Sequence, residues 1–197
     1  MSEGKGTEEE GVTTVPALLT ERLRLRPFTL ADAPVVQALA ADERVAALTL
    51  NIPHPYPPGA AEEWIATHAP AASAGTAYTF AIERATDNAL LGAIGMHPNA
   101  RHRRAEIGYW LGVPYWGQHY MSEAARRVVT FGFDTLALNR VQATCLPRNL
   151  ASAGVMRNAG MTYEGRLRAY ICKQGTAEDI EMYAILRDEW ETKGVSA

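Results

Sequence analysis

Apolar and polar residues alternate along the first part of the chain that can form regular structure. Over residues 18–27 leucines and arginines alternate, which predicts a strand with one polar face, and Pro27 ends it. Helical spacing follows, with a first helix that Thr29 can cap and that carries Val35, Val36, Leu39 and Val45. A second helix is expected over residues 60–72, and the proline-rich residues 51–59 between the two helices are expected to form a loop.

The rest of the chain switches repeatedly between strand and helix patterns. Three tandem strands joined by short turns predict an antiparallel meander, and a helix, a strand, a second helix and a closing hairpin follow. In chain order these elements are expected at residues 77–84, 90–97 and 106–111 for the meander, then 122–138, 140–146 and 150–158, then 161–172 and 176–186 for the hairpin.

This order predicts an α/β (α+β) fold built on a mixed, mostly antiparallel, seven-stranded sheet flanked by helices. The helix over residues 122–138 connects two neighbouring strands in parallel, by a right-handed crossover. The sheet is expected to splay at this strand pair, residues 104–111 and 140–146, and diverging strands leave a cleft at their ends.

Length and composition indicate one globular domain. The 197 residues, 47% of them hydrophobic, are enough for a single core, and we expect a domain over residues 16–192 behind a mobile Gly-, Glu- and Thr-rich tail over residues 1–15. The net charge of -3 gives no electrostatic reason to expect nucleic acid. No run approaches the ~20 apolar residues that span a bilayer, so we predict no membrane partner and a cytoplasmic location.

Cysteine and histidine add little chemistry. Cys145 and Cys172 both lie in apolar strand patterns, which predicts two buried, reduced thiols. The five histidines lack the spacing of a zinc site, so no metal is expected. The basic residues 101–104 are interpreted as a solvated hairpin turn rather than a nucleic-acid patch.

Residues 108–124 are a strand, a short loop and a helix start. A helix N-terminus offers free backbone N–H groups and the positive end of a dipole, and both favour phosphate. The pattern therefore suggests a phosphate-bearing ligand at residues 117–122, with an ordinary strand-to-helix connection as the alternative.

Several motifs, in their order and spacing, carry a family resemblance. They are Thr20–Arg26 with Thr29–Asp32; Ala105–Leu111; Tyr115–Gln118 with Glu123 and Ala124; Asn149–Ser152; Asn158–Met161; and Glu164, Gly165 and Asp179 near the end. Over residues 18–190 the chain resembles the GNAT superfamily of acyl-CoA N-acyltransferases, and within it the RimJ/RimL-like branch.

The resemblance implies acetyl-CoA as co-substrate, no metal, and direct transfer of the acetyl group to a primary amine. The strand that ends at Leu111 would offer backbone groups to the pantetheine arm, and residues 117–122 would hold the pyrophosphate. The coenzyme-binding residues implied in this way are Trp110, Leu111, Gly112, Trp116, Gly117, Gln118, His119, Tyr120, Met121, Ser122, Asn149 and Ser152.

The loop departs from the family pattern at two positions. His119 stands where glycine is expected, and Met121 stands where a small residue is expected. Glycine serves there because backbone approaches phosphate closely and can need a positive φ. His119 is expected either to donate to a phosphate or to face solvent.

The resemblance also suggests the catalytic residues. Ser152 matches the position whose hydroxyl protonates the departing thiolate, since Met156 replaces the tyrosine that many relatives use; the alternative is a helix serine without chemistry. Glu106 is the first candidate for the base and water the second, because Ile171 replaces a glutamate credited in close relatives. The alternative for Glu106 is a solvated or Arg104-paired carboxylate, and Asn149 is expected to cap a helix, contact pantetheine, or both.

The acceptor is expected to be an amine, with a protein or peptide N-terminal α-amine first and a small molecule next. An α-amine has a pKa of about 8 and is partly neutral at pH 7, whereas a lysine amine near 10.4 needs a stronger base. The aromatic residues Tyr109, Trp110, Tyr115 and Trp116 are expected to line the acceptor cleft or to be core. The alternative function is a non-catalytic acyl-CoA-binding module, and a homodimer through the terminal hairpin is plausible.

Overall fold

The computed structural model describes residues 14–193. The mobile tail expected over residues 1–15 therefore lies, except for its last two residues, outside the described residues. The strands are β1 Leu18–Leu19, β2 Leu23–Pro27, β3 Tyr78–Arg84, β4 Leu90–Asn99, β5 Arg104–Leu111, β6 Arg140–Cys145, β7 Thr162–Lys173 and β8 Thr176–Leu186. The helices are α1 Ala33–Ala40, α2 Glu43–Leu48, α3 Ala60–Ala66, α4 His68–Ser73, α5 Tyr120–Asp134, α6 Leu150–Asn158 and α7 Arg187–Lys193, with short 3-10 turns at Leu30–Asp32, Ala100–His102 and Val113–Tyr115.

The strands form one sheet in the order β1-β2-β3-β4-β5-β6-β8-β7. Every pairing is antiparallel except that of β5 with β6, so the predicted mixed, mostly antiparallel architecture is confirmed. The predicted count of seven strands is wrong, because the sheet has eight. Residues 18–27 form two short strands rather than one, since the chain turns at Thr20, whose backbone N–H donates to Leu23.

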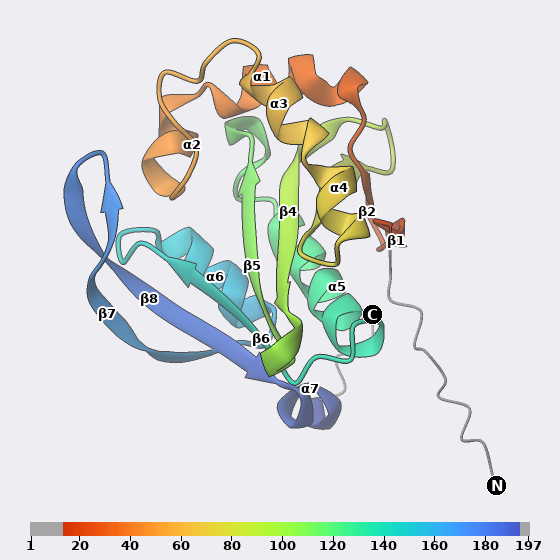
Figure 1. The fold of residues 1–197 in the computed structure, drawn as a ribbon, viewed down its shortest axis with the longest axis vertical. Coiled ribbons are helices and arrows are strands. Elements are labelled where there is room, and N and C mark those ends of the chain that lie inside the picture. The colour runs from red at the N-terminus through yellow and green to blue at the C-terminus, as the bar shows by residue number, and fades with distance from the viewer. Residues whose placement is uncertain (1–13, 194–197) are drawn as a thin grey trace, which may run out of the picture.

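The predicted splay lies between β5 and β6. Their parallel pairing runs only from Arg104 opposite Arg140 to Glu106 opposite Gln142. Beyond Glu106, β5 continues to Leu111 along β4 alone, and in Figure 1 β5 and β6 spread apart above this point. Diverging strands leave backbone and side chains of β5 accessible in a sheet that otherwise pairs them.

Helices cover both faces of the sheet, and each face has its own apolar cluster. The larger core packs α5 and α6 on one face, with Phe80, Phe131 and Met96 fully buried. A smaller cluster packs α1 and α3 on the opposite face, around Val36 and Ile65. Full burial of a phenylalanine or methionine side chain stabilises a fold by roughly 1.5–3 kcal/mol, so both helical layers are firmly attached to the sheet.

Two expected helices are broken, each for a local reason. Asp42 caps a new helix by accepting from the Arg44 backbone N–H, which places Val45 in α2 rather than in α1. The helix expected over residues 60–72 divides at Thr67, and Pro70, which has no N–H to continue the helical ladder, follows in α4. The helix expected over residues 122–138 is α5, which begins at Tyr120 and ends at Asp134.

The β7–β8 hairpin extends beyond the rest of the sheet and curves toward α2 (Figure 1). At its end the Lys173 ammonium donates to the carbonyl oxygens of Ala46 and Thr49, at 2.8 and 2.6 Å. Cys145 is buried but Cys172, in this hairpin, is exposed, so the prediction of two buried thiols is wrong for Cys172; both are free. Among residues 14–193, no helix combines the length and apolar character needed to cross a bilayer.

Candidate active site

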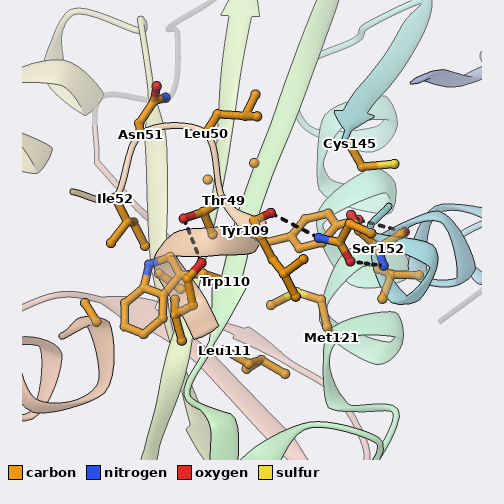
Figure 2. A pocket seen from close by; sticks show the side chains of 18 of the residues that line it. Thr49, Leu50, Asn51, Ile52, Tyr109, Trp110, Leu111, Met121, Cys145 and Ser152 are labelled. Atoms are coloured by element: carbon orange, nitrogen blue, oxygen red, sulfur yellow. Dashed lines mark hydrogen bonds between the residues drawn. The ribbon is translucent and has the colours of Figure 1, made fainter. Parts of the chain in front are cut away.

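A cavity of about 1090 Å³ passes through the splay in the sheet. Its lining comes from both faces of the sheet, since Trp110 packs with the α1 and α3 cluster whereas Tyr109 and Leu111 pack with the α5 and α6 core. Figure 2 shows Asn51 and Ile52 on one side of the cavity and Cys145 and Ser152 on the other. Two molecules can therefore approach one point of β5 from opposite faces.

The loop before α5 forms one end of the cavity. Gly117 and His119 both have left-handed backbones, with φ of 74° and 63°, and His119 is the N-cap of α5 without a side chain that caps the helix. The amide groups of the first turn are thus open to an anion, as expected for a phosphate site. The family pattern has glycine at this position, and the backbone of His119 does adopt a positive φ. The His119 side chain is exposed.

A network to the first strands holds this loop in place. Glu123 accepts from the Thr20 hydroxyl at 2.5 Å, from the Arg22 backbone N–H at 2.9 Å and from Arg22 Nε at 2.7 Å. Arg22 Nη1 also donates to the Gln118 carbonyl at 3.2 Å. Partial burial pushes the pKa of Glu123 upward, but the three hydrogen bonds outweigh it and lower the pKa. The first and third family motifs therefore meet here, and Arg22 was not among the residues that the sequence singled out for the site.

Ser152, one turn into α6, faces Tyr109 on β5. The Tyr109 hydroxyl lies 3.0 Å from Ser152 Oγ and 3.2 Å from the Ser152 carbonyl oxygen, to which it can donate. Burial raises the pKa of Tyr109, and the hydrogen bond with Ser152 opposes that rise. Burial also raises the pKa of the neighbouring Cys145 thiol, to about 11, so near neutral pH it is a thiol rather than a thiolate.

Asn149 is the N-cap of α6, as expected. Its side-chain oxygen accepts from the Ser152 backbone N–H at 3.0 Å, and its amide nitrogen donates to the Leu48 carbonyl at 3.1 Å. Asn149 also lines the cavity. It thus ties the serine-bearing helix to the end of α2, on the opposite face of the splay.

Glu106 is half-buried in the cavity at the last residue of the β5–β6 ladder. Its carboxylate accepts from Gln142 Nε2 at 3.3 Å and from the Thr144 hydroxyl at 3.1 Å, both on β6. Among the described residues it forms no ion pair with Arg104, the partner considered from the sequence. A period-two pattern could have revealed its partners, since Arg140, Gln142 and Thr144 alternate with apolar residues.

Most of the predicted coenzyme-binding residues line the cavity. Trp110, Leu111, Trp116, Gly117, His119, Tyr120, Met121 and Ser122 lie on its wall. Gly112 and Gln118 do not: Gly112 packs under Leu39, and the Gln118 side chain donates to the Pro114 carbonyl. The Leu111 carbonyl already accepts from Trp116 Nε1 at 2.8 Å. Met121 is buried and belongs to the core.

The four aromatic residues left open between cleft and core all line the cavity: Tyr109, Trp110 and Tyr115 are half-buried, and Trp116 is exposed. Within residues 14–193, histidine, cysteine, aspartate and glutamate side chains form no group of three or more that could hold a metal ion.

Comparisons with known proteins agree with this geometry. Residues 22–162 match the model of the acetyltransferase (GNAT) domain. The chain is 34% identical over 173 residues, 87% of its length and 97% of the relative's, to the uncharacterized N-acetyltransferase YoaA of Bacillus subtilis strain 168.

Solved structures share the fold. A GNAT-family acetyltransferase from Bacillus anthracis has a TM-score of 0.79 at 26% identity, covering 88% of this chain and 99% of that one. RimL, a ribosomal alpha-N-protein acetyltransferase in complex with coenzyme A, has a TM-score of 0.80 at 22% identity, with 88% and 99% covered. The chain belongs to the GNAT family of acetyltransferases, and it is an acetyl-CoA-dependent N-acetyltransferase.

Proposed function

We propose that this acetyltransferase acts on a primary amine, with the N-terminal α-amine of a protein or peptide as the first choice and a small amine as the second. The observation that carries the proposal is the cavity beside the splayed part of β5, whose lining comes from both faces of the sheet. Such a cavity brings an acyl donor and an amine together without a covalent enzyme intermediate, because both reach the same backbone segment.

The residues on the α5 and α6 side fit coenzyme A. The amides at residues 117–122 would bind its pyrophosphate, and Asn149 and Ser152, which line the same cavity, would contact the pantetheine arm and the sulfur. Acetyl-CoA supplies an activated acetyl group as a thioester. In this proposal Ser152 gives a proton to the departing sulfur, and the contact of its hydroxyl with the Tyr109 hydroxyl at 3.0 Å supports the role.

The α-amine is favoured on chemical grounds. With a pKa of about 8, an α-amine loses its proton more readily than a lysine side chain near 10.4. RimL, which has a similar fold, is named an alpha-N-protein acetyltransferase. The opposite side of the cavity, between the 49–57 loop and β4, offers an apolar chamber for the residue that carries the nitrogen.

The test is a competition among acceptors. The purified protein receives acetyl-CoA with three peptides: one with a free N-terminus and no lysine, one with a blocked N-terminus and a lysine, and one with both. We expect tandem mass spectrometry to find the acetyl group on the α-nitrogen of the first and third peptides. Acetylation confined to lysine side chains, or to small amines in a parallel reaction, would overturn the choice of acceptor.

A further inference from the structure

His97 lies on the cavity side of β4, directly opposite Glu106 on β5. Residues directly opposite in an antiparallel pair have Cβ atoms about 4.5–5.5 Å apart, so the imidazole and the carboxylate share one corner of the cavity. Neither the motifs nor the composition singled out His97 beyond excluding a zinc site.

The imidazole lies along the strand toward Gly95. A Cβ atom added at Gly95 would stand 3.4 Å from His97 Nε2 and 3.6 Å from the hydroxyl of Thr79, which is opposite Gly95 on β3. Gly108 is opposite Gly95 on β5, and a Cβ added there would meet nothing within 4 Å. Because Gly95 and Gly108 have no side chains, there is open space beside the imidazole, and an acceptor amine can lie in it.

The charged side chains around this open space are few. Glu106 is the one carboxylate among the described residues that line the cavity, and that lining includes no lysine, arginine or aspartate. Its carboxylate already accepts from Gln142 and Thr144, which fixes its position beside this space. Glu106 is therefore suited to attract an ammonium group.

His97 is suited to accept a proton from the amine. In the part of the chain that the structure describes, its ring nitrogens have no hydrogen-bond partner, and the side chain is exposed to the cavity. Histidine is the side chain that most often acts as a general base in enzymes, and a base needs a free acceptor atom. Both carboxylate oxygens of Glu106 already accept hydrogen bonds.

Resting on the proposed function, we propose that His97 is the catalytic base that deprotonates the acceptor amine, with Glu106 holding the ammonium group beside it. The N–H bond of the ammonium breaks and a proton passes to an imidazole nitrogen. The freed lone pair forms the N–C bond to the acetyl carbon as the C–S bond breaks. The departing sulfur takes the proton of Ser152, and the nitrogen loses its second proton, which passes through water to the serine oxygen. The imidazole then releases its proton to solvent, so the products are the amide, free coenzyme A thiol and one proton, and both side chains return to their starting states.

The test is steady-state kinetics of His97→Gln with an acceptor that the wild type acetylates, and His102→Gln as the matched control. His102 is exposed in the turn after β4 and lies outside the cavity. We expect kcat/KM for the amine to fall about 100-fold or more at pH 7 in His97→Gln, with the KM for acetyl-CoA unchanged. His102→Gln should match the wild type.

The pH profile separates a base from a structural residue. Removing the base should lower kcat/KM for the amine by a smaller factor as the pH rises past the pKa of the amine, because the amine is then already neutral. Glu106 is the titratable side chain directly opposite His97, and the cavity lining also includes His119 and the titratable side chains Tyr56, Tyr109, Tyr115, Tyr120 and Cys145. These groups titrate equally in the wild type and the variant, so the ratio of the two profiles isolates His97. The His97→Gln deficit should therefore shrink toward alkaline pH, and added imidazole should restore part of the activity of His97→Ala.

Two other outcomes are distinguishable. If the wild type acetylates no amine, the proposed function fails. If the wild type is active and His97→Gln stays within threefold of it at pH 7, or its deficit is the same at every pH and imidazole rescues nothing, the assignment of His97 is wrong while the proposed function stands.

Discussion

The hydroxyl of Tyr109 on β5 lies 3.0 Å from the hydroxyl of Ser152 on α6, across the point where the sheet splays. The two residues come from segments 43 positions apart in sequence. Their contact joins β5, which lines the cavity, to the helix that carries the proposed proton donor. With Tyr109 donating, the Ser152 proton is not used in this contact, and in the proposed reaction it goes to the departing sulfur.

This contact predicts a coupled loss of activity. Tyr109→Phe removes one hydrogen bond, worth about 1.5 kcal/mol in a low-dielectric site, and should lower kcat roughly tenfold with little change in the KM for acetyl-CoA. Ser152→Ala should lower kcat more. The double variant should lose no more than Ser152→Ala alone, and additive losses would show that Tyr109 does not act through Ser152.

Arg22 should control affinity for the acetyl donor. Arg22→Ala frees Gln118 and leaves Glu123, next to the proposed pyrophosphate site, without its cation. The loosened loop and the unpaired carboxylate should raise the KM for acetyl-CoA about tenfold, since a hydrogen bond to a charged group contributes roughly 1.5–3 kcal/mol. Arg24→Ala, whose guanidinium is half-exposed and only 3.6 Å from Glu83, is the control and should leave that KM near the wild-type value.

His119→Gly should stabilise the protein. The left-handed backbone at His119, with φ of 63°, costs an ordinary residue roughly 1 kcal/mol that glycine avoids. Urea denaturation should show a gain of roughly 0.5–1 kcal/mol, and acetyl-CoA affinity measured by calorimetry should not fall. Met121→Ala, which empties a buried core position, should instead lose about 2–3 kcal/mol. A His119→Gly variant less stable than the wild type would contradict the strain argument.

His68 should make the fold acid-sensitive. It is buried between Trp64 and Phe28, and among the described residues neither ring nitrogen has a hydrogen-bond partner. Burial lowers its pKa to about 4, whereas the unfolded chain has a histidine pKa near 6.5. Between these values the unfolded state binds more protons, so the stability present above pH 6.5 is lost as the pH falls toward 4, by up to about 3 kcal/mol.

His68→Phe should remove this dependence while keeping the aromatic packing. The measurement is the free energy of unfolding in urea at pH 7 and pH 5, compared for the wild type, His68→Phe and the exposed control His102→Gln. The wild type and the control should lose more stability at pH 5 than His68→Phe. Equal losses in all three proteins would contradict the assignment.

Local patterns were enough to predict most of the sheet. The meander, the helix Leu150–Asn158 and the closing hairpin appear within a few residues of the predicted bounds, because each is set by its own periodicity and turns. The splay followed from connectivity, since the long helix α5 between β5 and β6 suits a parallel crossover within one sheet. The C-terminal helix α7 was missed because it is polar and its attachment is tertiary, through Trp190 against Phe133 and hydrogen bonds of Arg187 to the Phe133 and Leu138 carbonyls.

Tertiary contacts explain what the sequence could not show. The turn that divides residues 18–27 is held by Glu123, which is 103 positions beyond Thr20 in the chain. In the same way, His97 and Glu106 become neighbours only through the register of β4 and β5. A motif identifies residues that are adjacent in sequence, whereas the corner of the cavity that they form depends on strand pairing.

The most direct measurement counts products in one reaction. Wild-type protein, acetyl-CoA and a lysine-free peptide with an open N-terminus are mixed, and free coenzyme A thiol and acetylated peptide are quantified together over time. The account predicts one thiol released for each acetylated α-nitrogen, with both rates reduced in Ser152→Ala. Tight binding of acetyl-CoA without acetylation of this peptide or of any amine in a broad panel would contradict it and would indicate a non-catalytic acyl-CoA-binding protein.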